Sequence, residues 1–284
     1  ILTISKIIVL AVFIFYGLRK IMEQPTEAME SFTPFFPTGL GGVIVAMGLT
    51  FIAFEGYDLI ATVAEEIKQP EKNIPRATFI ALGMTVLIYL LILFVSLGAV
   101  NPDGLPGWQF LGKFKETAIV RAAEGFMPAF GVAVIVFGGL LSTMSALNAT
   151  VMAASRVAFS MGRDLWLPKK MATINAKTRT PHIAIFVTGI ILVTMALTLP
   201  IEAVGSAASL IFLLSFALVN LAVIVLRRKH PEIPRRYKVP LYPVIPVLGF
   251  LLNIFLALYQ FKFQPIAWFV TIGWVAVGLL LYYA

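Results

Sequence analysis

Long apolar stretches alternate with short polar connections along the whole chain. A helix needs about 20 predominantly apolar residues to cross the hydrocarbon core of a bilayer, and eight stretches approach or exceed that length. These predicted spans are residues 1–18, 40–61, 79–100, 130–159, 183–199, 203–226, 244–259 and 265–283. Since lipid offers no partner to backbone N–H and C=O groups, each span must be helical. The pattern predicts an all-α fold, a polytopic transmembrane helix bundle with eight spans.

Composition agrees with this fold class. Apolar residues make up 60% of the chain and charged residues 13%, whereas soluble domains contain about 25% charged residues. We therefore expect an integral, multi-pass membrane protein. The chain has no cysteine, which excludes disulfides and cysteine metal sites. G-x-S-x-G, H-E-x-x-H and P-loop patterns are also missing from the sequence, so we expect no enzyme activity, no cofactor and no metal site.

Basic residues are distributed unequally between the connections. Of the 22 Lys and Arg residues, fifteen lie on one side: fourteen follow the second, fourth or sixth span, and Arg156 lies in the last turn of the fourth. Six lie in the other connections. Short cytoplasmic loops of membrane proteins carry such an excess. We therefore expect both ends of this chain in the cytoplasm. The same bias explains the net charge of +8 without a nucleic-acid partner.

Lys6 is the only charged residue in the first predicted span. A cation at the centre of a membrane helix costs roughly 2.5–3.5 kcal/mol on insertion scales, so it is rarely present without a partner or a task. One interpretation is an ion or proton site. The alternative is that Lys6 lies close enough to the helix end to extend its amine into the headgroups.

Two carboxylates, Glu55 and Asp58, flank Gly56 within the second predicted span. A continuous apolar helix gives no reason for either acid or for the glycine. Unwinding at Gly56 would expose backbone carbonyls at membrane depth, which is how transporters build a polar site in a dry bundle. The alternative is that the helix ends near Gly56 and both acids are interfacial. We favour the broken helix.

Four blocks of the sequence, in this order, resemble a known family. The first is Phe54-Glu55-Gly56-Tyr57-Asp58, followed by Glu65-Glu66 and a loop from Gln69-Pro70 to Pro75; the others are residues 142–168, Thr178-Arg179-Thr180-Pro181 and Arg236-Tyr237-Lys238-Val239-Pro240. They are similar to the sixth helix and its loop, the eighth helix, the loop before the ninth and the entry to the eleventh in amino acid permeases. The chain thus resembles the amino acid-polyamine-organocation superfamily over its whole length.

The resemblance implies the fold in more detail. The eight spans correspond to the family's fifth to twelfth helices, within a fold in which the first five and next five helices form an inverted repeat. Residues 1–284 would form a single transmembrane domain, with core helices in 1–226 and a basic linker plus two accessory helices in 227–284. The first four helices are missing. They are expected in a longer polypeptide or, alternatively, in a separate partner chain.

A substrate site also follows from the resemblance. In the family, carbonyls of the unwound sixth helix hold the substrate amino group, which implies a site at Ile52, Ala53, Phe54, Glu55 and Gly56 for an amino acid or related amine. The family's aromatic gate falls at Ile52, which is not aromatic, so Phe51 or Phe54 is expected to take that role. The amides that bind the substrate carboxylate lie in the missing first helix.

Proton coupling is implied in the same way. Lys6 aligns with a lysine of proton-coupled members that lies against the eighth helix, where Ser142 and Thr143 occupy the positions of sodium ligands in other relatives. A desolvated amine can lose and regain a proton, and Glu55 and Asp58 are further candidates for proton transfer. The expected function is a proton-coupled secondary active transporter of amino acids in a plasma membrane. The alternatives are a non-transporting or split-transporter subunit and an ion channel or sensor.

Overall fold

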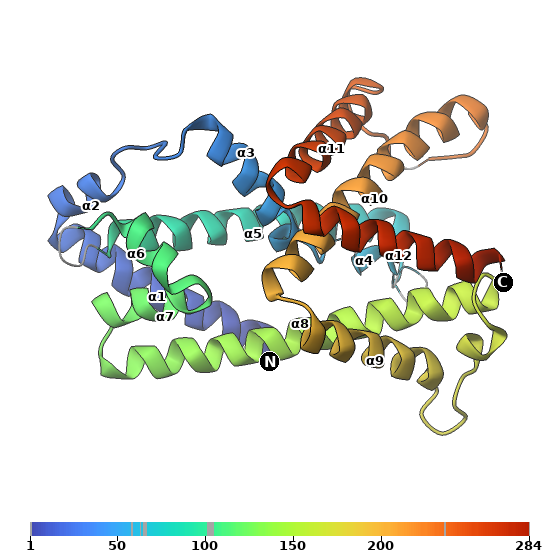
Figure 1. Cartoon of the computed structure of the whole chain (residues 1–284), viewed down its shortest axis with the longest axis horizontal. Coiled ribbons are helices and arrows are strands. Elements are labelled where there is room, and N and C mark those ends of the chain that lie inside the picture. Colours follow the sequence, from blue (N-terminus) through green and yellow to red (C-terminus); the bar gives the residue numbers. More distant parts are fainter. Residues whose placement is uncertain are drawn as a thin grey trace. The chain divides into compact units, whose positions relative to one another are not determined.

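The computed structural model describes residues 2–57, 59–62, 64, 67–100, 105–235 and 237–283. Helices are the only regular elements in this part of the chain, as the sequence predicts (Figure 1). They are α1 (Leu2–Glu23), α2 (Pro25–Ser31), α3 (Gly39–Thr50), η1 (Phe51–Phe54), α4 (Leu59–Thr62), α5 (Pro70–Gly98), α6 (Gly107–Phe114), η4 (Lys115–Thr117), α7 (Ala118–Phe126), α8 (Ala129–Arg163), η5 (Lys169–Ala172), α9 (His182–Thr198), α10 (Ile201–Lys229), α11 (Val244–Phe263) and α12 (Pro265–Tyr283), in which η marks a 3₁₀ helix.

Five of the described helices are long and apolar enough to cross a membrane: α5, α8, α10, α11 and α12. The second and fifth predicted spans correspond to shorter apolar helices, Gly39–Phe54 and α9. The first corresponds to the 22 residues of α1. The multi-pass organisation is therefore confirmed, whereas the count of eight spans and the inverted repeat stay predictions.

The helices form two compact units. Unit 1 contains Ile1–Pro37 and Ile80–Thr150, and unit 2 contains Thr38–Phe79 and Val151–Ala284. Helices α5 and α8 each contribute one part to unit 1 and the other part to unit 2. The expected organisation, one transmembrane domain with core helices in 1–226 and accessory helices in 227–284, stays a prediction.

In unit 1, α1 packs closely against α5 and α8. Phe13 and Val95 are almost completely buried in its core. Gly17 allows the approach to α5, because a Cβ at this position would overlap the Val95 side chain. Similarly, a Cβ on Gly138 of α8 would lie only 2.6 Å from a methyl carbon of Val9. Small residues let membrane helices approach in this way.

In unit 2, α10 is the central helix and packs against α3, η1, α11 and α12. One face of α10 is deeply buried, with Ala207, Ser209, Leu210 and Leu213 at 2% exposure or less. Polar contacts add to this packing, because the Gln260 amide of α11 donates to the Ser206 carbonyl at 3.1 Å. The face of α10 that includes Ser209 supports the candidate site.

Candidate functional site

The second predicted span is not one continuous helix, which agrees both with a broken membrane helix and with a helix that ends near Gly56. α3 ends at Thr50, and the chain continues as the 3₁₀ helix η1 from Phe51 to Phe54. Glu55 is extended, with φ −61° and ψ 150°, and Gly56 has φ 117°. Helix α4 begins only at Leu59. The backbone therefore leaves α geometry four residues before Glu55 and turns at Gly56.

Gly56 is required by backbone conformation. A φ of 117° lies in a region that L-residues with a side chain rarely adopt. A Cβ at Gly56 would meet no atom within 4 Å. The glycine is therefore explained by the turn after η1, not by a close contact.

The Ser209 hydroxyl of α10 is inserted at the junction of α3 and η1. It accepts the backbone N–H of Ile52 at 3.2 Å and donates to the Leu49 carbonyl at 3.3 Å. In a continuous α-helix, the Ile52 N–H would instead donate to the carbonyl of Gly48. A side chain that enters the helical ladder is an established cause of a sharp helix distortion. Ser209, with 0% exposure, therefore stabilises the break from a neighbouring helix.

Phe216, seven residues after Ser209 on the same face of α10, supports the other end of the break. Its ring stacks on Tyr57 with a centroid distance of 5.9 Å and an interplanar angle of 11°. It also meets Phe51 edge-on at 6.0 Å. Aromatic pairs in such geometries contribute about 0.5–1.5 kcal/mol beyond their area burial. One residue of α10 thus holds aromatic groups on both sides of Gly56.

The interrupted segment, residues 51–57, presents main-chain groups in directions that a regular helix does not offer. The Ile52 carbonyl accepts the Glu55 N–H at 3.0 Å, and a carbonyl oxygen has a second lone pair for another donor. Such an oxygen, near the carboxylate-bearing Glu55, suits an ammonium group. The substrate-binding roles of Ile52, Ala53, Phe54, Glu55 and Gly56 stay predictions, as do the gating roles of Phe51, Ile52 and Phe54.

Some predicted residues lie outside the part of the chain that the structure describes. Asp58, the second acid of the motif and a candidate for proton transfer, is one of them. The others are Glu65 and Glu66 of the acidic pair and Arg236 at the entry to the eleventh family helix.

Lys6 is half-buried on α1 in unit 1. Its ammonium donates a long hydrogen bond of 3.4 Å to the Ser145 hydroxyl of α8. Gly138 of α8 contacts Val9 of α1, and the later residue Ser145 of α8 contacts the earlier residue Lys6 of α1. The two helices therefore run antiparallel (Figure 1). Lys6 therefore lies against α8, the helix that the resemblance matches to the family's eighth.

The hydroxyl of α8 that contacts Lys6 belongs to neither of the two residues named from the sequence, and the proton-coupling roles of Ser142 and Thr143 stay predictions. Ser142 and Thr143 are exposed, and the Thr143 hydroxyl donates to the carbonyls of Gly139 and Leu140 in its own helix. Ser145 takes the contact instead. Since Ser145 lies seven residues after Gly138, the residue that packs on Val9, both share one face of α8.

Three residues of these sites were missed from the sequence: Ser145, Ser209 and Phe216. Ser145 could have been identified from its spacing, because it is a small residue seven positions after Gly138 and therefore lies on the same face of the helix. Ser209 and Phe216 carried only a weak one, a hydroxyl and an aromatic ring seven residues apart in an apolar helix.

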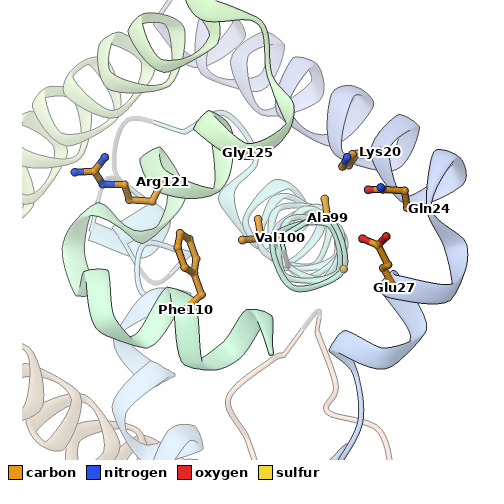
Figure 2. Close-up of a pocket in the computed structure, with 9 residues that line it drawn as sticks. Lys20, Gln24, Glu27, Ala99, Val100, Phe110, Arg121 and Gly125 are labelled. Atoms are coloured by element: carbon orange, nitrogen blue, oxygen red, sulfur yellow. The ribbon is translucent and has the colours of Figure 1, made fainter. Parts of the chain in front are cut away.

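A cavity of about 310 Å³ lies in unit 1 beside the end of α5. Figure 2 shows Lys20, Gln24 and Glu27 on one side of it and Arg121 on the other. Arg121 is paired with Glu124 at 2.8 Å. No residue predicted to bind substrate or protons lines this cavity, so it is not the candidate site.

Comparison with known proteins agrees with the family resemblance of the sequence. Residues 1–281 match the family described as "Amino acid permease". The chain is 31% identical over 283 residues to the branched-chain amino acid permease BcaP of Bacillus subtilis (strain 168), which covers 100% of this chain and 57% of the relative. It is 28% identical over 284 residues to the methylthioribose transporter of the same organism, with coverage of 100% and 58%.

A third relative, the inner membrane transport protein YbaT of Escherichia coli (strain K12), is 30% identical over 250 residues, or 88% of this chain and 55% of the relative. The chain spans a little more than half the length of these curated relatives. Because the family match covers almost every residue of the chain, the chain belongs to the amino acid permease family.

Proposed function

We propose that the protein is a secondary active transporter of amino acids and that the substrate amino group binds at the interrupted segment, residues 51–57. The observation that carries this proposal is the break itself. A 3₁₀ turn, an extended Glu55 and a positive φ at Gly56 occur in an apolar helix of a chain that belongs to a permease family. Broken helices of this kind form the substrate sites of many secondary transporters.

The substrate class follows from the chemistry of the segment. An α-ammonium group has three N–H donors, and the segment offers backbone carbonyls together with Glu55. A relative at 31% identity is named for branched-chain amino acids, whereas another is named for methylthioribose, a sugar without an ammonium group. We favour amino acids because an α-ammonium group can donate to the backbone carbonyls of the segment and also attract the Glu55 carboxylate, whereas methylthioribose offers no positive charge.

A binding experiment separates these two ligand classes. Scintillation proximity measurements on the purified protein would use tritiated branched-chain, small neutral and cationic amino acids, with unlabelled methylthioribose as competitor. Saturable binding of an amino acid that methylthioribose does not displace would support the proposal. Displacement by methylthioribose at lower concentration than by any amino acid would contradict it.

We also propose that Lys6 couples transport to protons. Its ammonium meets the neutral Ser145 hydroxyl, and it forms no ion pair with a carboxylate in the described part of the chain. This contact with α8 supports the proposal because the resemblance implies a coupling lysine that lies against the same helix. On the basis of the cation distribution, we place both ends of the chain in the cytoplasm of a cell whose plasma membrane holds the protein.

The alternative, a non-transporting subunit that needs a separate chain, has less support. The matched segment is part of a longer single chain in each of the three relatives. All three have names that describe transport.

A further inference from the structure

A hollow of about 490 Å³ lies at the C-terminal end of α10, in unit 2. Its polar lining consists mainly of Arg227, Arg235, Lys238 and Tyr242, and we call it the basic hollow. One acid, Glu232, also lines it. This hollow is separate from the interrupted segment and has no role in the proposed transport cycle.

Among the residues that the structure describes, the cations of the basic hollow have no acidic partner. Glu232 is paired with His230, with 3.0 Å between the carboxylate oxygen and Nδ1. Arg227, Arg235 and Lys238 form no ion pair within the described residues. Three positive charges around one concave surface that has a single carboxylate give a site that favours an anion.

Two of these cations are fixed in place by the protein. The Arg235 guanidinium donates to the carbonyls of His230 at 2.7 Å, Leu226 at 3.1 Å and Ile233 at 3.2 Å. The Arg227 guanidinium lies 4.4 Å from the centre of the Tyr242 ring. A cation held in this way loses little further freedom when an anion binds, so the binding costs less entropy.

The position of the hollow indicates the source of the anion. α10 is a candidate membrane span of 29 residues, and its last turn contains Arg227, Arg228 and Lys229. The hollow therefore lies where an apolar helix passes into the polar phase, the level of lipid headgroups. Basic pockets at such positions bind phosphate-bearing lipid headgroups.

We propose that the basic hollow binds a phosphate group, as presented by the headgroup of an anionic phospholipid. Guanidinium groups match phosphate oxygens in geometry and charge. The proposal depends only on insertion of the protein into a membrane and is independent of the transported substrate. Free inorganic phosphate offers the same chemistry, so the experiment includes it.

The test uses the purified protein in neutral detergent micelles and native mass spectrometry. Phosphatidylglycerol, phosphatidylcholine and inorganic phosphate are titrated separately against the wild type, the double variant Arg227→Gln/Lys238→Gln and the control Lys169→Gln/Lys170→Gln. The control removes the same charge from η5, which does not line the hollow. Arg235 is left intact because its hydrogen bonds stabilise the end of α10.

The proposal predicts that phosphatidylglycerol binds more tightly than phosphatidylcholine and that Arg227→Gln/Lys238→Gln weakens its binding about 10- to 30-fold. The control should stay within twofold of the wild type. Binding of inorganic phosphate that is weakened to the same extent by Arg227→Gln/Lys238→Gln would support the phosphate site and identify the free anion as a second source. Equal affinity in wild type and Arg227→Gln/Lys238→Gln, with both folded by circular dichroism, would overturn the proposal, as would an equal loss in the control.

Discussion

Ser209→Ala is the perturbation that tests the support of the broken helix most selectively. The substitution removes one hydroxyl and leaves the polypeptide otherwise unchanged. The Ile52 N–H then loses its acceptor at 3.2 Å, and the Leu49 carbonyl loses its donor at 3.3 Å. Because Ser209 is fully buried, water does not replace the hydroxyl without rearrangement. The Ile52 N–H is instead expected to return to an α-helical acceptor, which straightens the segment.

The size of the effect follows from these bonds. Loss of one partner in a buried hydrogen bond costs about 1–3 kcal/mol. The bond from the Ile52 N–H is longer than the usual length of about 2.9–3.0 Å for N–H···O, and the bond from the Ser209 hydroxyl is longer than the usual length of about 2.7–2.8 Å for O–H···O. Ile52 itself is only half-buried. We therefore expect Ser209→Ala to destabilise the broken conformation by about 1–2 kcal/mol relative to a continuous helix. If an amino acid binds only the broken conformation, its affinity should fall by up to about 5- to 30-fold, the full factor applying where the two conformations are close in free energy.

Two measurements on each variant check this reasoning. Amino acid affinity is determined by calorimetry, and hydrogen exchange of the backbone amides of residues 49–57 reports on the break. Ser206→Ala is the matched control, because Ser206 is similarly buried on α10 and no hydroxyl contact from it to α3 or η1 is found among the described residues. Unchanged affinity in Ser209→Ala, or an equal loss in Ser206→Ala, would refute the assignment of Ser209 as a positioning residue.

Three further predictions concern the sites themselves. Lys6→Gln keeps a donor for Ser145 but removes the charge, so uptake driven by a pH gradient should be lost while amino acid exchange persists in proteoliposomes; driven uptake at the wild-type rate would exclude Lys6 from coupling. Gly56→Ala should lower the melting temperature because a side chain at φ 117° costs about 1–3 kcal/mol, whereas Gly83→Ala, in α5 and equally open, should not; similar melting temperatures would show that the turn is not strained. Glu55→Gln should weaken amine binding by at least about tenfold, the effect of a lost charge-assisted contact, and equal affinity by calorimetry would assign Glu55 to a structural role.

Hydropathy predicted the positions of the long helices better than their ends. α12 agrees with the prediction, and α10 extends three residues past the predicted end at 226. α5 begins at Pro70, nine residues before the predicted span. The reason is that an apolar stretch reports only the part of a helix that lipid surrounds. Polar turns that extend into the aqueous phase follow the same backbone geometry without an apolar signal.

The break was predictable because its cause lies partly in the local sequence. Gly56 between acids in an apolar helix is inconsistent with a regular transmembrane helix. The contribution of Ser209 was not predictable, since the contact joins residues 157 positions apart. Nothing in the local sequence distinguishes a serine that bonds to another helix from one that bonds within its own.

The partner of Lys6 shows a different limit. The resemblance gave the helix that Lys6 contacts but not the hydroxyl that meets its amine, because Ser142, Thr143 and Ser145 lie within one turn of α8. Which of them faces α1 depends on the rotation of α8 about its axis. The close contact of Gly138 with Val9 sets that rotation, and such a contact is a property of the folded pair.

Uptake of amino acids by the purified protein in proteoliposomes tests the central claim most directly. A pooled radiolabelled mixture would be offered with and without an inward proton gradient, for this sequence and for the longer polypeptide that the family resemblance predicts. The account predicts concentrative uptake that requires the gradient in the longer polypeptide. Uptake that is equal with and without the gradient would contradict proton coupling, and the failure of the folded longer polypeptide to accumulate any amino acid would contradict the proposed transport function.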